Sequence, residues 1–118
     1  MRTVPFRSIL GGFAAQHPHV LAVVFCDEEG ERVESIVVDT AVDPYELDVL
    51  GASLAPLAPT LARQGSETCV RVLRARDVIW VRSVSDRYYV VAWARRASVD
   101  ARIGAGLDDV AHALRAHM

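Results

Sequence analysis

The sequence predicts an α+β protein in which helices cover both faces of one five-stranded antiparallel sheet. Two apolar segments flank an acidic, glycine-containing turn at residues 27–30, and three more apolar segments follow residue 67 with short polar turns between them. Segments with helical periodicity lie before, between and after these strands. The expected order is helix, two strands, helix, three strands, helix (α-β-β-α-β-β-β-α), a sandwich in the profilin-like style.

Length and composition indicate a single globular domain over residues 1–118. The chain is 52% hydrophobic and 24% charged, with a formal net charge of -2. These values favour neither disorder nor binding to nucleic acid. No apolar run reaches the ~20 residues of a membrane span, and the N-terminus lacks a signal-peptide core, so we expect a cytoplasmic protein without membrane insertion. All 13 basic residues are Arg, which favours a GC-rich bacterial source.

The first elements are a short helix and a hairpin. Residues 5–15 carry apolar side chains at helical spacing, weakened by two consecutive glycines. Val20 to Cys26 is continuously apolar, as expected of a central strand covered on both faces, and Arg32 to Val38 returns as a strand nearer the sheet edge.

A second helix is predicted from Asp43 to Arg63. Asp43 can cap its N-terminus and Pro44 suits the first helical position. Along it a leucine seam recurs at spacings of three and four, typical either of a core stripe or of two helices packed side by side: Leu47, Leu50, Leu54, Leu57 and Leu61. Two internal prolines predict a kink or break near Ala55 to Thr60.

Three strands and a last helix complete the expected fold. Gly65 ends the second helical segment, and the strands Thr68 to Arg74, Val78 to Val84 and Tyr88 to Ala94 form a meander with alternating faces. Ser98 caps a helix whose apolar positions repeat at three and four: Val99, Ile103, Leu107, Val110 and Leu114.

No pattern of catalytic, cofactor-binding or metal-binding residues emerges from the sequence. Cys26 and Cys69 are interpreted as buried structural thiols, because Asp27 and Glu28 beside Cys26 would raise the pKa of its thiol. The four histidines have no zinc-site spacing and are expected at the surface: His17, His19, His112 and His117. The acidic turn lacks an EF-hand pattern.

Several arginines gather around the predicted meander: Arg71, Arg74, Arg76, Arg82 and Arg87. The acidic net charge argues against a phosphate-binding footprint, so we expect no nucleic-acid partner. Ordinary charged turns are the simplest interpretation, and contact of the hairpin-tip residues Arg76 and Arg87 with an acidic protein is the alternative.

Three stretches together resemble the roadblock / dynein light-chain family over nearly the whole chain. They are VLAVVFCDEEGERVESI, DPYELDVLGASLAPLAPTLARQG and RVLRARDVIWVRSVSDRYYVVAWARR, followed by an amphipathic helix. The chain is most similar to the small bacterial single-domain members, of the MglB and MglC type. The resemblance implies a non-enzymatic homodimer, without cofactor, that regulates or scaffolds a Ras-like small GTPase or binds a sister roadblock protein in cell polarity or motility.

The resemblance also implies where two copies would meet. The dimer helix would be Asp43 to Arg63 and the dimer strand Thr68 to Arg74, which gives the expected interface Leu47, Leu50, Leu54, Leu57, Leu61, Val70 and Val72. Pro56 and Pro59 depart from the pattern expected of that helix. The seam is thereby interpreted as core plus symmetric interface.

Two other function classes stay open at this point. A small-ligand sensor of profilin-like fold would use a pocket lined by aromatic residues, namely Trp80, Tyr88, Tyr89 and Trp93. An enzyme using Cys26 or Cys69 would show fast thiol alkylation in the folded protein, and we expect slow labelling.

Overall fold

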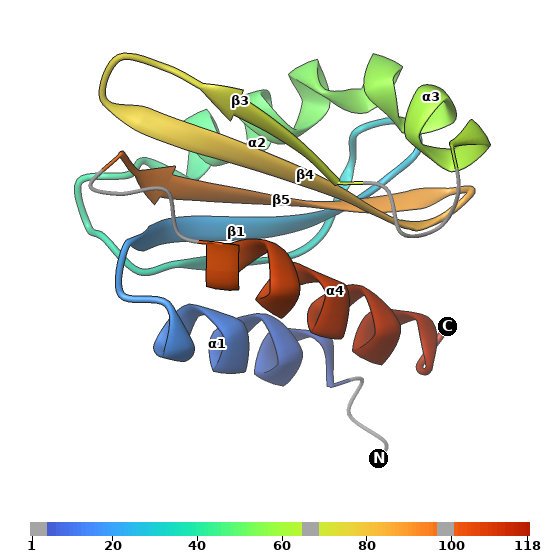
Figure 1. Cartoon of the computed structure of the whole chain (residues 1–118), viewed down its shortest axis with the longest axis horizontal. Coiled ribbons are helices and arrows are strands. Elements are labelled where there is room, and N and C mark those ends of the chain that lie inside the picture. Colours follow the sequence, from blue (N-terminus) through green and yellow to red (C-terminus); the bar gives the residue numbers. More distant parts are fainter. Residues whose placement is uncertain (1–4, 65–68, 97–100) are drawn as a thin grey trace.

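The computed structural model of the chain describes residues 5–64, 69–96 and 101–118. Five strands form one antiparallel sheet in the order β2-β1-β5-β4-β3 (Figure 1). Helices α1 (Phe6–Gln16) and α4 (Ala101–Arg115) cover one face, and α2 (Pro44–Ser53) and α3 (Ala58–Arg63) cover the other. The expected α+β sandwich is confirmed, with one more helix than the sequence predicts.

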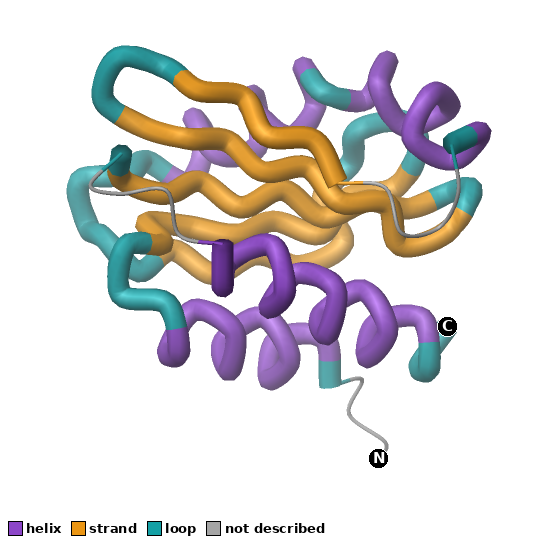
Figure 2. Tube along the Cα trace, viewed as in Figure 1, coloured by secondary structure: helices purple, strands orange, loops and turns teal. Residues whose placement is uncertain are grey.

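The strands occupy nearly the predicted segments. They are β1 (Val20–Asp27), β2 (Arg32–Val37), β3 (Cys69–Leu73), β4 (Asp77–Ser85) and β5 (Tyr88–Arg95). Figure 2 shows the three-stranded meander from β3 to β5 and the hairpin of β1 and β2 joined into one sheet. The edge position predicted for β2 is confirmed. β1 is an interior strand, as predicted, because it pairs with both β2 and β5. The middle strand of the five is β5, which pairs with β1 and β4.

Alternation along β4 and β5 divides the apolar side chains between two cores, as predicted. Trp80 and Tyr88 pack into the core beneath α1 and α4. Tyr89 and Trp93 pack into the core beneath α2 and α3. Successive side chains of a strand point to opposite faces, so a sheet covered on both sides needs apolar residues at nearly every position.

The second helical segment is broken, as its prolines predict. The Asp43 carboxylate accepts a 2.9 Å hydrogen bond from the Tyr45 backbone N–H and starts α2, which ends at Ser53. A 3₁₀ turn, η1 (Ala55–Leu57), and α3 follow. Pro59 sits in the first turn of α3, where a missing N–H costs no intrahelical bond. The expected single helix from Asp43 to Arg63 is therefore corrected to two helices.

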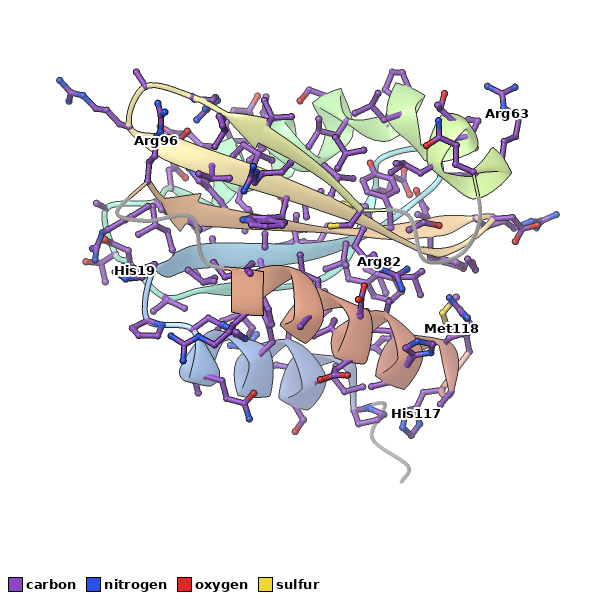
Figure 3. The ribbon with its side chains drawn as sticks, in the orientation of Figure 1. His19, Arg63, Arg82, Arg96, His117 and Met118 are labelled. Carbon is purple, nitrogen blue, oxygen red and sulfur yellow. The ribbon has the colours of Figure 1, made fainter. Side chains whose placement is uncertain are left out.

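The closing helix α4 lies beside α1 and is tied to β4 by polar contacts. The Arg82 guanidinium donates a 2.8 Å hydrogen bond from Nε to the Asp108 carboxylate, and Arg115 Nε donates a 2.7 Å bond to the Val84 carbonyl oxygen. Figure 3 shows Arg82 between the sheet and α4. The predicted cap Ser98 lies outside the described residues, as do Val99, Gly65 and Thr68. Within the described ranges, no helix is long and apolar enough to cross a membrane.

Candidate protein interface

Strand β3 is an edge strand whose outer side meets no other strand of the described chain. It pairs with β4 from Cys69 opposite Arg82 to Leu73 opposite Val78. Val72 is 38% exposed and Leu73 47% exposed. An exposed edge with apolar side chains is a template for pairing with another chain, because its outward backbone N–H and C=O groups form no hydrogen bonds with a neighbouring strand.

A groove opens between α2 and the end of the sheet where β3 turns into β4. We call it the α2 groove. It has a volume of about 490 Å³ and is lined by Tyr45, Glu46, Val49, Leu50, Ser53, Arg74 and Trp93. Tyr45 is 73% exposed and Val49 49% exposed. Large apolar side chains left in water beside arginine and tryptophan are typical of protein-binding surfaces.

One wall of the α2 groove is held by the Asp77 carboxylate. Arg74 donates to it from Nε over 2.5 Å and from Nη2 over 2.6 Å, and the Trp93 indole N–H donates over 2.8 Å. The Arg74 guanidinium lies 5.8 Å from the centroid of the Trp93 ring. The hydrogen bond from Arg74 is the main reason that the pKa of Asp77 is lowered. Two charge-assisted bonds to one carboxylate fix the orientation of this wall.

The end of the sheet that adjoins the α2 groove is rich in arginine. The Arg96 Nη1 donates a 3.0 Å hydrogen bond to the Arg74 carbonyl oxygen, and its backbone N–H donates a 3.2 Å bond to the Arg76 carbonyl oxygen. Figure 3 shows Arg96 beside the β3–β4 hairpin. Arg95 pairs with Asp39 over 2.7 Å. Arg76 and Arg96 are exposed, so their charges face solvent.

The residues predicted for the interface occupy different depths. Leu47 and Leu61 are 0% and 2% exposed and belong to the core between α2, α3 and the sheet. The others are half-buried or exposed and lie nearer the surface: half-buried Leu50, Leu54 and Val70, and exposed Leu57 and Val72. Leu47 and Leu61 therefore lie where a helix that covers a sheet places its apolar side chains. A role of the other five residues in an interface remains a proposal.

Sequence reasoning named Leu50, Arg74 and Trp93 for other reasons, but it did not single out Tyr45, Val49 and Ser53, which line the α2 groove with them. Tyr45, Val49 and Ser53 recur every four residues on α2, on a different face from Leu47 and Leu54. This four-residue spacing is the sequence pattern from which a second helix face carrying Tyr45 and Val49 could have been predicted. Arg74 and Trp93 come from the β3–β4 hairpin and β5, and their approach to α2 depends on the packing of the sheet.

Both thiols lie in surroundings that disfavour the reactive thiolate. Burial is the main reason that the pKa of Cys26 is raised to about 12 and that of Cys69 to about 11. Cys26 is 1% exposed in β1, and Cys69 is half-buried in β3. These positions agree with the interpretation of structural thiols.

Two predictions about polar residues are wrong. The sequence predicts His17 at the surface, but the residue is 8% exposed and its ring centroid lies 4.8 Å from that of Phe13. Arg82 is grouped by sequence with the solvated arginines of the meander, but it is 0% exposed and paired with Asp108. In both cases a partner from another element, α1 or α4, determines the position.

The acidic turn between β1 and β2 is stabilised by hydrogen bonds from its own backbone N–H groups to the Asp27 side chain. One oxygen of the Asp27 carboxylate accepts hydrogen bonds of 2.9 Å and 3.0 Å from the backbone N–H groups of Glu29 and Glu31. Gly30 adopts φ 85° there, a left-handed conformation that glycine accepts without a steric penalty. In the part of the chain that the structure describes, no group of three His, Cys, Asp or Glu side chains is placed to hold a metal ion.

The four aromatic residues proposed for a ligand pocket do not share a cavity. Trp80 and Tyr88 lie on the α1 and α4 side of the sheet, and Tyr89 and Trp93 on the α2 side. The Tyr89 side chain is fully buried, and its hydroxyl donates a hydrogen bond to the Gly51 carbonyl oxygen. The sheet therefore separates the two pairs, which leaves the small-ligand hypothesis without a common pocket.

Comparison with solved structures decides the fold. The gliding protein MglB of Thermus thermophilus matches with a TM-score of 0.80 at 13% sequence identity, over 98% of this chain and 92% of that one. The chain has the roadblock fold. A Roadblock/LC7 domain from Streptomyces avermitilis gives a TM-score of 0.77 at 16% identity, over 92% and 93% of the two chains. MglC from Myxococcus xanthus gives 0.67 at 23% identity, over 96% and 98%.

The resemblance to roadblock proteins that the sequence pattern indicated is confirmed at the level of the fold by these solved structures. No known family model and no curated protein sequence matches the chain. A roadblock fold can be built from many sequences, because its apolar positions and turns are specified by pattern more than by identity. Another MglB structure of similar fold has a tetrameric arrangement.

Proposed function

We propose that this roadblock-fold chain is a non-enzymatic adaptor or regulator that forms a homodimer and binds a Ras-like small GTPase or a sister roadblock protein. Its place would be the cytoplasm of a bacterium, in cell polarity or motility. The likeness to MglB, a gliding protein, and to MglC supports this proposal. The mechanism is surface complementarity, which favours one state of the partner's switch loops without chemistry of its own.

The observation that carries the homodimer is the open edge of β3. An antiparallel contact between two such edges would continue one sheet into the other, satisfying backbone groups that otherwise face water. Val70 and Val72 share the α2 side of that strand, so two copies would bring the same apolar side chains together. Leu57, exposed in η1 on the same side of the sheet, would add apolar contact area.

The test of the homodimer is a molar-mass measurement in solution with two matched variants. Val72→Arg places a charge on edge strand β3, and Val33→Arg places one on β2, the other edge strand of the sheet. The two valines are similarly exposed, at 38% and 40%. We expect Val72→Arg to reduce the dimer to a monomer and Val33→Arg to leave it intact.

Two outcomes would overturn this dimer. A wild-type monomer at all accessible concentrations would remove the homodimer itself. A dimer that survives Val72→Arg but not Val33→Arg would move the contact to β2. Leu54→Arg is a less specific probe, because Leu54 is half-buried and packs against the core, so its substitution also weakens the fold.

The regulatory role is tested by GTP turnover of a Ras-like GTPase with and without this protein. Measurable binding with unchanged turnover supports an adaptor, and faster turnover supports an activating protein. Failure to bind any small GTPase or roadblock protein encoded beside its gene would contradict the proposed partners.

A further inference from the structure

We propose that Arg7 and Glu34 close the β2 edge of the sheet against a further strand, so that a second copy of the chain can extend the sheet only along β3. We call these two side chains and the Ser35 backbone groups that they hold the β2 clamp. Such a clamp lies outside the proposed adaptor function, because it limits association instead of creating a contact. It does not require the proposed homodimer, since a monomer has the same edge.

Two side-chain atoms hold both backbone groups of Ser35. The Ser35 N–H donates a 3.0 Å hydrogen bond to Glu34 Oε1, and Arg7 Nη1 donates a 3.3 Å hydrogen bond to the Ser35 carbonyl oxygen. The same two atoms, Arg7 Nη1 and Glu34 Oε1, lie 3.5 Å apart as an ion pair. The two charges and the Ser35 backbone therefore form one compact set of contacts.

The Ser35 backbone groups point away from the rest of the sheet. In an antiparallel pair, the backbone groups of successive residues point alternately toward the neighbouring strand and away from it. The Val38 N–H donates a 2.8 Å hydrogen bond to the Leu21 carbonyl oxygen of β1, so Val37 and Ser35 direct their groups outward. An incoming strand would have to displace both side chains from Ser35 and remove their charges from water, which is costly.

A β-bulge in β2 also disfavours pairing along this edge. Glu34 and Arg32 lie opposite consecutive residues of β1. Val33 between them therefore has no partner on β1, and an extra residue of this kind bends the strand and interrupts the ladder. Bulges and charged side chains are two means by which native sheets protect their edges. β2 combines both.

The packing of α1 places Arg7 beside β2. The ring of Phe6, the preceding residue, lies 5.3 Å from the Phe25 ring in an edge-to-face contact within the core beneath α1 and α4. Ile36, two residues after Glu34, packs against the same core, so Glu34 also points to the α1 side of the sheet. The side chains of Arg7 and Glu34 are 70% and 32% exposed, and an ion pair at such exposure is weak. Apolar packing of α1 thus fixes the position of the clamp.

The opposite edge of the sheet lacks such a clamp among the described residues. β3 pairs with β4 without a register shift. The Arg74 N–H donates to the Asp77 carbonyl oxygen across the hairpin, so Arg71 and Leu73 direct their backbone groups away from β4. Among the side chains that the structure describes, none hydrogen-bonds to these groups. The sheet therefore has one closed edge and one open edge.

The experiment opens the clamp with the double variant Arg7→Ala/Glu34→Ala and follows molar mass by light scattering over a range of concentrations. In a Val72→Arg background, in which the charge blocks β3, opening the clamp should double the mass, because a two-fold contact between β2 edges closes at two copies. In the wild-type background both edges would be open. We expect species larger than a dimer there, with a mass that rises with concentration.

The matched control is Arg32→Ala/Asp48→Ala. This pair joins the same strand to α2 over 3.6 Å, with side chains 49% and 38% exposed. The control removes one arginine and one carboxylate, as the clamp variant does, but leaves the contacts of Ser35 in place. Its molar mass should equal that of the parent chain. A cooperative urea transition for each variant establishes that it is folded.

Amide hydrogen exchange measured by NMR tests the clamp without relying on association. In the Val72→Arg background, Glu34→Ala removes the acceptor of the Ser35 N–H, so exchange at Ser35 should become severalfold faster. The Val37 N–H, which also points outward from β2, is the internal reference and should keep its rate.

Three results would overturn the proposal. They are an unchanged molar mass after the clamp is opened in both backgrounds, equal association of the control variant, and a Ser35 exchange rate that does not respond to Glu34→Ala. A wild-type dimer that Val33→Arg disrupts would also end it, because the β2 edge would then be paired already. A wild-type monomer would contradict the homodimer alone, since each comparison here is between a chain and its own clamp variant.

Discussion

The Tyr89 hydroxyl of β5 donates a 2.7 Å hydrogen bond to the Gly51 carbonyl oxygen of α2 and fixes that helix against the sheet. Gly51 is buried at the contact, and a Cβ atom there would lie 2.9 Å from Cys26 Sγ and 3.3 Å from Val24 Cγ1. The distance between α2 and β1 therefore depends on the absence of a side chain at residue 51.

Gly51→Ala should destabilise the protein by about 1–3 kcal/mol, because helix and sheet must separate to admit the methyl group. The higher helix propensity of Ala offsets less than about 1 kcal/mol of this loss. Gly12→Ala in α1 is the matched control: its Cβ would meet no atom within 4 Å, so propensity alone should raise stability by about 0.5–1 kcal/mol. Urea unfolding of both variants checks the opposite signs, and a stabilised Gly51→Ala variant would contradict the close contact.

The ion pair of buried Arg82 with half-exposed Asp108 should respond unequally to removal of its two members. Asp108→Ala leaves the fully buried guanidinium without this carboxylate, and we expect a loss of about 1–3 kcal/mol, moderated by the half-exposed position of Asp108. Arg82→Leu removes the buried charge itself and should be nearly neutral or stabilising. Denaturant unfolding measures which of the two variants loses more stability. Asp109→Ala, at an exposed position on α4, is the control. A larger loss for Arg82→Leu would show that the arginine stabilises the fold beyond its pairing.

Asp77 should make stability depend on pH in the acidic range. Its pKa is lowered, chiefly by the hydrogen bond from Arg74, so the folded state favours the carboxylate. The resulting stabilisation is fully present above the ordinary Asp value of about 3.9 and is lost as pH falls through the lower folded pKa. The stability difference between wild type and Asp77→Asn should thus be largest near neutral pH and shrink below about pH 4. Urea midpoints across this range give the profile, and Arg74→Ala should raise the Asp77 pKa measured by NMR.

Both cysteines should react slowly with iodoacetamide while the protein is folded. With pKa values raised to about 12 for Cys26 and about 11 for Cys69, the thiolate is scarce at about pH 8, and burial restricts access further. Alkylation should be slower than in urea by about a hundredfold or more, as followed by intact-protein mass spectrometry. Fast labelling of Cys26 in the native state would reopen the hypothesis of an enzyme that uses a thiol.

Much of the fold was predictable because apolar pattern and turn chemistry act locally. The alternation in β4 and β5, the Asp43 cap and the proline break after Ser53 follow from spacing and backbone rules. The central position of β5 did not follow, because local sequence does not encode which strands become neighbours when a hairpin and a meander join. The candidate interface was partly predictable: Val72 is exposed on an edge strand, whereas Leu47 and Leu61 are in the core.

The sequence by itself determined the kinds and order of the elements, the two-sided burial of the sheet and the absence of a recognisable catalytic motif. The tertiary structure decided that β3 is an edge, that Arg82 and His17 are buried, and that Tyr45, Val49, Arg74 and Trp93 line one groove. The physical reason is the sequence separation of the interacting residues. Periodicity and helix capping depend on residues that are close along the chain. Burial and surface shape depend instead on contacts between residues far apart in sequence.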